Sequence, residues 1–265
     1  MYAFEYLRAG SLDEACARLG EGSARALAGG QTLLGAMKLR MSQSDRLVDL
    51  GGIAELRGIE DRTSSLVIGA MTRHAEVAAS SRVRERIPAL AALAAGIGDV
   101  QVRNMGTIGG SVANNDPAAC YPSALLALDA TVHTSRRSLQ AEAFFTGFYG
   151  TALKEGELIR SVEFPVPRRA AYVKFRQPAS RFALVGVFVA QTAGGARVAV
   201  TGGGAGVFRA TALESSLDQA FTADSLRGLR FPPDDLASDL HASAEYRAHL
   251  IPVLASRAVE QALAD

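Results

Sequence analysis

The sequence predicts an α+β protein that contains more than one compact unit. Three observations support this. The chain has 265 residues, enough to bury a sizeable core and to form two or three units. Strand-like and helix-like segments alternate through its first half. Beyond residues 165–169 the pattern changes to two apolar runs on either side of Gly194-Gly195, which is typical of a β-hairpin.

The first half opens with a clear helix signal. Residues 11–20 predict a short helix in which Ser11 is the N-cap, Glu14 completes a capping box and Gly20 ends the helix. The segments that follow alternate in pattern. Strands are expected over 24–28, 46–50, 65–70, 131–134 and 159–164, and helices over 33–41, 73–80, 87–95 and 119–128.

Local residue choices justify three of these helices. In the helix at 33–41, Leu34, Met37 and Met41 are expected on one face. Thr72 is predicted to cap the helix at 73–80. The Asp116-Pro117 pair places a capping carboxylate before a proline, so it predicts the start of the helix that continues through 119–128.

The second half is expected to form a sheet-and-helix domain. Strands at 183–191 and 197–201 would make the hairpin, and helices follow over 212–221 and 244–264. The run Gly202-Gly203-Gly204 has no basic or capping residue directly after it. It therefore predicts a tight turn and not a phosphate loop.

Charge and cysteine content exclude several classes of protein. The 28 Lys and Arg residues balance 27 Asp and Glu, which argues against broad binding to nucleic acid or an anionic membrane. Cys16 and Cys120 fit no metal-cluster spacing, so no bound metal is expected and a reducing, cytoplasmic location is the default. The first residues lack the features of a secretion signal, and no run of 18 apolar residues predicts a membrane span.

Two glycine-bearing segments carry most of the chemical information: 28–32 (AGGQT) and 107–117 (TIGGSVANNDP). Paired glycines let a backbone approach a ligand closely. A turn that opens a helix leaves N–H groups free to hold phosphate, so two such turns suggest a ligand with more than one phosphate, held from two sides. Neither segment is a GxGxxG or GxxxxGK[ST] loop, which disfavours a plain Rossmann dehydrogenase or a P-loop NTPase.

These segments, with their flanks, resemble a known family. AGGQTLLGAMKLR and TIGGSVANNDPAACYPSALLALDA are similar to the two FAD-binding signatures of the medium subunit of molybdenum hydroxylases, the family of the carbon monoxide dehydrogenase medium subunit and the xanthine dehydrogenase FAD subunit. FEYLRAGSLDEA, IGAMTRH, GELIRSVEFPVP, KFRQPASRFALVGV and HASAEYRAHL recur in that family in the same order. The resemblance covers nearly the whole chain.

The resemblance implies an FAD-binding fold of the vanillyl-alcohol-oxidase (PCMH) type with a C-terminal domain. The FAD-binding domain would span 1–173, as two subdomains that divide near 52–60, and the C-terminal domain would span 174–265. FAD is expected to be non-covalent. The partners would be a large molybdopterin-binding subunit and a small [2Fe–2S] subunit, and FAD would pass electrons to quinone, NAD⁺ or O₂. The chain would not be active alone.

The residues that match the family's cofactor-binding positions are Leu27, Ala28, Gly29, Gly30, Gln31, Thr32, Gly98, Val102, Gly106, Thr107, Gly110, Ser111, Asn114, Cys120, Ile159 and Lys174. By resemblance, the two glycine segments would hold the pyrophosphate and ribityl regions from opposite sides. Gly98 and Val102 would lie along the adenosine half. Ile159 would pack over the flavin ring and Lys174 would lie at its edge. No catalytic residue and no metal ligand is implied.

Two positions depart from the family pattern. Cys120 stands where the family commonly has aspartate, which removes a charge near the flavin. Gln31 stands where carbon monoxide dehydrogenases typically have histidine, so a covalent flavin link is not expected at this loop. As a lone cysteine at the start of an apolar helix, Cys120 also fits a small buried hydrophobe.

Two other functions stay open at this point. One is a stand-alone flavoprotein oxidoreductase of the same fold, and the other is a non-catalytic nucleotide-binding or assembly module whose site has decayed around Cys120. The four histidines are scattered, without a Cys or Glu at ligand spacing. They are interpreted as surface or packing residues: His74, His133, His241 and His249.

Overall fold

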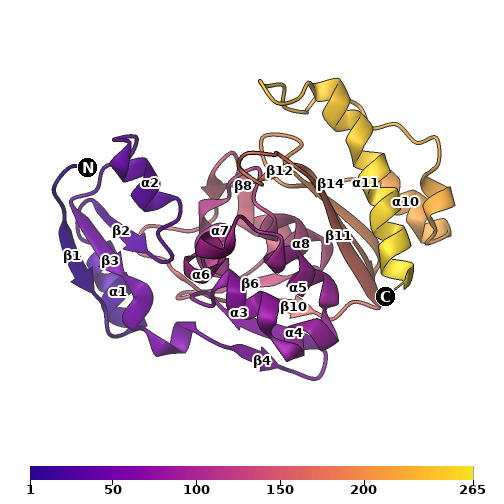
Figure 1. Cartoon of the computed structure of the whole chain (residues 1–265). Helices are drawn as coiled ribbons and strands as arrows, with labels where there is room; N and C mark the ends of the chain where they lie inside the picture. Colours follow the sequence, from indigo (N-terminus) through magenta and orange to yellow (C-terminus); the bar gives the residue numbers. More distant parts are fainter. Residues whose placement is uncertain (265) are drawn as a thin grey trace.

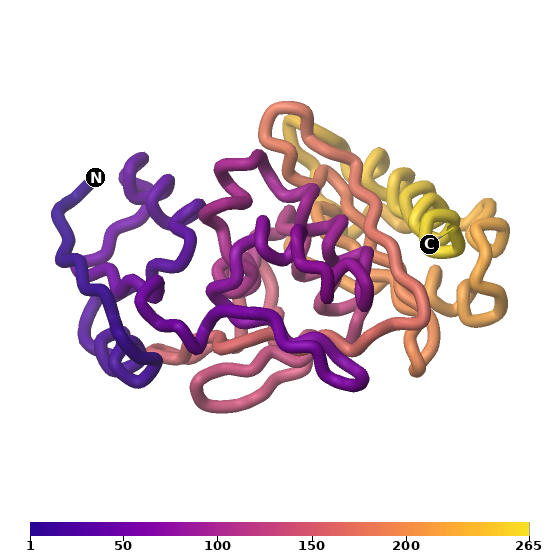
Figure 2. Tube along the Cα trace, turned by 60° about the horizontal axis from the view of Figure 1, so that its bottom comes forward, coloured from indigo at the N-terminus to yellow at the C-terminus, as the bar shows by residue number. Residues whose placement is uncertain are grey.

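Three sheets follow one another along the chain in the computed structural model, which describes residues 1–264. Figure 1 shows them in a row, with the N-terminal sheet at one end and the long C-terminal helix α11 (Ala244–Ala264) at the other. The tube trace in Figure 2 keeps the same order. None of the described helices is long and apolar enough to cross a membrane.

The N-terminal unit is a small parallel sheet with strand order β1-β3-β2. Its strands are β1 (Glu5–Arg8), β2 (Ala24–Leu27) and β3 (Arg46–Asp49). Helix α1 (Leu12–Leu19) connects β1 to β2, and α2 (Leu33–Lys38) connects β2 to β3. The short 3₁₀ turns η1 (Leu50–Gly52) and η2 (Ala54–Leu56) lead out of this unit.

The middle unit is a five-stranded antiparallel sheet with strand order β4-β5-β10-β6-β7. Its strands are β4 (Ile59–Asp61), β5 (Ser65–Gly69), β6 (Thr131–Thr134), β7 (Ser138–Gln140) and β10 (Ile159–Pro165). Its helices are α3 (His74–Ala79), α4 (Ser81–Arg86), α5 (Pro88–Ala95), α6 (Val100–Met105), α7 (Ile108–Asn114), α8 (Tyr121–Ala127) and α9 (Ala141–Phe144). A two-stranded ribbon, β8 (Phe145–Gly147) and β9 (Gly150–Thr151), follows α9.

The C-terminal unit is a four-stranded antiparallel sheet with the order β11-β12-β13-β14. Its strands are β11 (Arg169–Arg176), β12 (Ala183–Thr192), β13 (Gly195–Thr201) and β14 (Phe208–Arg209). Helix α10 (Thr211–Gln219), the 3₁₀ turn η3 (Ala223–Leu226) and α11 complete the unit.

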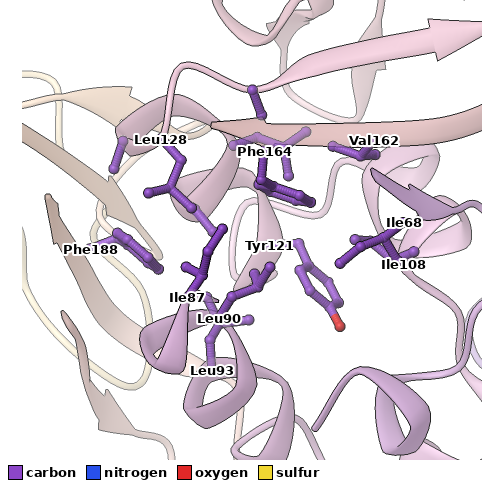
Figure 3. Close-up of a cluster of buried hydrophobic side chains, with 14 of the residues drawn as sticks. Ile68, Ile87, Leu90, Leu93, Ile108, Tyr121, Leu128, Val162, Phe164 and Phe188 are labelled. Atoms are coloured by element: carbon purple, nitrogen blue, oxygen red, sulfur yellow. The ribbon is translucent and has the colours of Figure 1, made fainter. Parts of the chain in front are cut away.

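The largest core joins the middle and C-terminal units. Tyr121 of α8, Phe164 of β10 and Phe188 of β12 meet there, all fully buried (Figure 3). Along β12 the side chains alternate: Phe188 belongs to this core, whereas Val187 and Val189 belong to the cluster under α11. Because both faces of β12 are covered, its sequence reads as one continuous apolar run.

The α+β prediction is confirmed, as are the expected helix at 11–20, the hairpin around Gly194-Gly195 and the terminal helix. Ser11 caps α1, since its Oγ accepts a hydrogen bond from the Glu14 N–H at 3.2 Å. The capping box is not formed as expected, because the Glu14 carboxylate accepts from the Gly10 N–H at 2.9 Å and not from that of Ser11. Several short strands escaped prediction, among them β4, β7, β8, β9 and β14, and so did β1 and β11. β1 is short, and β11 lies across the region where a domain boundary was expected.

Three local expectations were wrong. Helix α2 ends at Lys38, because Arg40 takes a left-handed backbone (φ 59°), and Met41 is exposed and does not share a face with Met37. Thr72 does not cap α3: its hydroxyl is bonded to the backbone of Gly58, and Arg73 is the N-cap, its N–H donating to the Glu76 carboxylate at 2.7 Å.

Asp116 does not start helix α8. Its carboxylate accepts from the Ala118 N–H at 2.9 Å and closes a single turn, and α8 begins at Tyr121. The Thr201 hydroxyl bonds to the carbonyl groups of Pro117 (2.8 Å) and Ala119 (2.6 Å). Because these carbonyl groups are bonded to Thr201, the turn is held against the C-terminal sheet and does not continue into a helix.

The expected domain division between residues 173 and 174 falls inside β11, which pairs with β12 over its whole length. We propose a division at 166–168, the short link between β10 and β11, because cutting a paired strand would break a continuous hydrogen-bond ladder. The expected subdomain split near 52–60 stays a prediction.

Candidate functional site

One large cavity, of about 1010 Å³, is bordered by residues of all three units. Ala24 and Arg25 line it from the N-terminal unit, both glycine segments line its middle, and Lys174 lines it from the C-terminal sheet. The cavity brings together every site residue expected from the sequence except Leu27. Leu27 ends β2, and its side chain lies beside Gly30 instead.

The first glycine segment forms a tight passage into α2. Gly30 has a positive φ of 69°, and a Cβ there would lie 2.8 Å from the Leu34 side chain. A Cβ at Gly29 would collide with the Met105 carbonyl oxygen of the neighbouring loop. Within residues 1–264 the N–H groups of Gly30, Gln31 and Thr32 have no acceptor. Three backbone donors at a helix start therefore lie along the cavity wall, an arrangement that suits an anion.

The second glycine segment differs from the expectation of free N–H groups. The N–H groups of Ile108, Gly109 and Gly110 donate to Thr72 O (3.0 Å), Ala70 O (2.8 Å) and Thr107 Oγ1 (3.1 Å) respectively. A Cβ at Gly109 would lie 2.5 Å from the Ala70 Cβ, so this glycine serves the packing of α7 against the end of β5.

Besides the Thr107 N–H, which has no acceptor within residues 1–264, the second segment can therefore offer a ligand mainly side chains. Ser111 and Asn114 line the cavity, and their side chains have no hydrogen-bond partner in residues 1–264. Thr107 is mainly structural, since its hydroxyl caps α7. Nearby, Gly98 takes a positive φ of 50° directly beside the Val102 side chain. Asp99 fixes this turn, because its carboxylate accepts from the Val102 N–H at 2.8 Å.

Ile159, Cys120 and Lys174 form another part of the cavity wall. Ile159 and Cys120 are both buried, each 5% exposed. The Lys174 Nζ donates to the Cys120 Sγ at 3.4 Å and to the Arg181 carbonyl at 3.0 Å. This wall combines one apolar face with one positive charge.

Two buried titratable groups on the cavity wall were missed as site residues. His74 was interpreted as a surface or packing residue, and it is buried and lines the cavity. Burial, with a smaller contribution from Arg103, lowers the pKa of His74 to about 4, so the imidazole is neutral at pH 7. A sequence signal existed, since His74 directly follows the turn after the apolar strand β5.

Glu157 is the second buried titratable group on the cavity wall. Burial alone would raise the pKa of Glu157, but hydrogen bonds outweigh it and hold the pKa at about 2. The donors are the Arg137 guanidinium at 3.1 Å, the Thr134 hydroxyl at 2.6 Å and the Lys154 N–H at 2.9 Å. Glu157 therefore anchors the loop that lines the cavity between β9 and β10.

This fold and cavity define a protein that binds a nucleotide-containing cofactor. Residues 2–167 match the family model described as the FAD binding domain in molybdopterin dehydrogenase, and the chain belongs to this family. It is similar to the carbon monoxide dehydrogenase medium chain of Hydrogenophaga pseudoflava, with 36% identity over 281 residues, covering 98% of this chain and 97% of the relative.

Solved structures agree. A carbon monoxide dehydrogenase structure from H. pseudoflava, lacking the Mo-pyranopterin moiety, superposes with a TM-score of 0.89 at 35% identity and covers 99% of this chain and 98% of that one. Quinoline 2-oxidoreductase from Pseudomonas putida 86 superposes with a TM-score of 0.86 at 29% identity, covering 98% of this chain and 97% of that one. The expected family is confirmed. The chain is an FAD-binding medium subunit of the molybdenum hydroxylase type, and an oxidoreductase subunit.

The residues present fit FAD. The cavity is at the upper end of the roughly 300–1,000 Å³ usual for ligand pockets. The unpaired N–H groups of the first glycine segment suit the pyrophosphate. The apolar wall at Ile159 suits a flat aromatic ring.

Proposed function

We propose that this chain transfers electrons from the [2Fe–2S] clusters of a small partner subunit, through FAD, to an external acceptor. A large molybdopterin-binding partner would oxidise the substrate and determine its identity. The observation that carries the proposal is one cavity lined both by backbone donors suited to a dinucleotide and by the Lys174 side chain. The relatives named above are chains of dehydrogenases and oxidoreductases, which supports the subunit role.

The residues of this chain would bind and orient the cofactor without acting as acid or base. The N–H groups of Gly30, Gln31 and Thr32 would hold the pyrophosphate, assisted by the side chains of Ser111 and Asn114. Gly98 and Val102 would border the adenosine half. When bound, FAD supplies the redox chemistry, since it can exchange electrons singly or in pairs.

The part of the wall formed by Ile159, Cys120 and Lys174 would set the cofactor's redox behaviour. Ile159 would pack against the flavin ring and exclude water from it. Lys174 would place a positive charge at the ring edge, which favours a negatively charged reduced state. Cys120 would touch this lysine where the family commonly carries a carboxylate. FAD would be held without a covalent bond, in a cytoplasmic complex in which Cys16 and Cys120 stay free thiols.

Two measurements test the proposal. The absorption spectrum of the purified chain, before and after incubation with FAD, should show flavin bands that persist through gel filtration. Purification from the native host should recover partner subunits with iron–sulfur absorbance, and the chain alone should not oxidise the substrate of that complex. A colourless chain that cannot be reconstituted, or a flavoprotein fully active without partners, would contradict the proposal.

The acceptor can be identified with the same complex. Reduced under anaerobic conditions and mixed rapidly with a quinone, NAD⁺ or O₂, the complex should be reoxidised fastest by its physiological acceptor. Competition between the three acceptors in one mixture provides the control. If none of the three acceptors reoxidised the flavin of the complex faster than it reoxidises free reduced FAD, the proposed electron transfer from this site to an external acceptor would be wrong.

A further inference from the structure

His74 is a buried polar side chain on the cavity wall with an unpaired atom. It is 5% exposed, and it lines the cavity at the start of α3. Its backbone N–H donates to the Gly106 carbonyl at 3.0 Å, which fixes the residue beneath the second glycine segment. The ring Nδ1 is buried and has no hydrogen-bond partner within residues 1–264.

The ring lies directly under Gly106. A Cβ at Gly106 would lie 2.6 Å from the His74 Nε2, so the imidazole fits only because this position is glycine. On the other side is Tyr121, whose ring centroid lies 5.4 Å from that of His74. The Tyr121 hydroxyl is also buried and unpaired, and Figure 3 shows it turned away from the surrounding apolar side chains. His74 lines the cavity and Tyr121 does not.

Unpaired buried polar atoms are costly, at about 1–3 kcal/mol each, and folded proteins leave few of them. The His74 Nδ1 and the Tyr121 hydroxyl are both closed to the cavity, so a ligand there can meet the imidazole only through its Nε2, which also has no hydrogen-bond partner within residues 1–264. The N–H groups of Ile108, Gly109 and Gly110 are all engaged elsewhere and are not available to a ligand. Besides the Thr107 N–H, which has no acceptor within residues 1–264, this wall therefore offers a cofactor mainly side chains.

The charge state of His74 indicates which chemical group of a ligand the ring can bind. Burial and the Arg103 guanidinium lower its pKa to about 4, so the ring is a neutral donor and acceptor at pH 7. A phosphate would favour the protonated imidazole, whereas a hydroxyl can both give and accept a hydrogen bond with the neutral ring.

We propose that His74 is a further FAD-binding residue, whose Nε2 hydrogen-bonds a hydroxyl of the cofactor's sugar portion next to Gly106. The inference rests on FAD binding in the cavity. It adds a third side chain, from α3, to the Ser111 and Asn114 side chains of α7.

Two substitutions of His74 separate binding from packing. His74→Phe keeps a buried ring but removes both nitrogens, and it should weaken FAD binding about tenfold, the equivalent of about 1.4 kcal/mol. The melting temperature of the FAD-free chain should hold or rise, because an unpaired polar atom is lost. His74→Gln keeps a neutral donor and acceptor and should restore affinity to within about threefold. Affinity is measured by the change in flavin fluorescence on titration with FAD.

Tyr121→Phe is the matched control: it removes the neighbouring unpaired hydroxyl, which does not line the cavity, and should leave FAD affinity unchanged. Wild-type affinity in His74→Phe overturns the proposal, as does equal weakening in His74→Phe and His74→Gln. If His74→Phe does not fold, ¹⁵N imidazole shifts of the wild-type chain decide, since they must move on adding FAD. A wild-type chain that binds no FAD would instead contradict the proposed function itself.

Discussion

Lys174 and Cys120 touch across 54 positions of sequence, with the lysine Nζ 3.4 Å from the cysteine Sγ. The contact joins β11 to the turn before α8, and the Thr201 hydroxyl holds that turn through the carbonyls of Pro117 and Ala119. The C-terminal sheet therefore contributes a charge to a cavity built mainly by the FAD-binding family domain.

Cys120→Asp should lower the midpoint potential of bound FAD. A carboxylate beside Lys174 offsets its positive charge, so a negatively charged reduced flavin gains less stabilisation. We expect a shift of roughly 30 mV, equivalent to about 1.4 kcal/mol for a two-electron couple. Spectroelectrochemical titration measures it. Cys120→Ser is the neutral control, and an equal potential in both variants would mean that Lys174 does not act on the flavin.

Gly30→Val and Gly110→Val should each reduce FAD retention at least tenfold. At Gly30 a side chain is strained by the positive φ and meets Leu34, and at Gly110 a Cβ would lie 3.0 Å from the Thr107 hydroxyl that caps α7. Flavin content after gel filtration gives the result. Gly35→Ala is the control, because a Cβ there meets nothing within 4 Å. Unchanged flavin content in both valine variants would disprove the assignment of the glycine segments.

Acidification should destabilise the FAD-free chain through His74. Its pKa falls from 6.5 to about 4 on folding, so the folded state binds fewer protons. Above pH 6.5 His74 does not reduce the free energy of unfolding. As the pH falls towards 4 the free energy of unfolding decreases, by about 2 kcal/mol at pH 5. The Arg103 guanidinium and the Tyr121 hydroxyl offer no negative charge to compensate. Urea denaturation at pH 8 and pH 5 measures the loss, which should be absent in His74→Phe.

Glu157→Gln should destabilise the chain by about 2 kcal/mol at pH 7. The substitution removes the charge that accepts hydrogen bonds from Arg137, Thr134 and the Lys154 N–H, and leaves the guanidinium poorly compensated. Chemical denaturation reports the difference. Glu155→Gln, at an exposed neighbouring position, should have no effect, and equal losses in the two variants would argue against an anchoring role for Glu157.

Arg247→Met should weaken the attachment of α11 to the sheet by about 3 kcal/mol. The buried guanidinium donates to the carbonyls of Leu184 and Gly202, both at 2.6 Å, and to Asp239 at 2.8 Å. Thermal melting and hydrogen exchange in α11 detect the change. Arg257→Met, at an exposed position of the same helix, should melt like the wild type. Equal protection of α11 in both variants would show that Arg247 is dispensable.

Much of the fold was predictable because its signals are local. Ser11 and Glu14 define the start of α1, and the glycines between two apolar runs define the β12–β13 hairpin. The family resemblance of the glycine segments and the other motifs also predicted the residues that meet in one cavity, Leu27 excepted.

Other features depended on contacts that sequence spacing does not encode. Thr72 looked like a helix cap, but its hydroxyl is taken by Gly58, and Asp116 closes a turn because Thr201 binds the carbonyls that follow it. His74 and Glu157 look like ordinary polar residues in the sequence; the fold lowers the pKa of His74 through burial and that of Glu157 through hydrogen bonds that outweigh burial.

The sequence by itself determined the family and the cofactor through the resemblance of its motifs to those of FAD-binding subunits, and it determined many local elements because turn, cap and periodicity rules act over a few residues. The tertiary structure alone decided which polar groups stay free for a ligand. The N–H groups of α7 are engaged by Ala70 and Thr72, whereas those at Gln31 and Thr32 are not. Hydrogen-bonding capacity is shared among segments distant in sequence, so only their packing determines what remains for FAD.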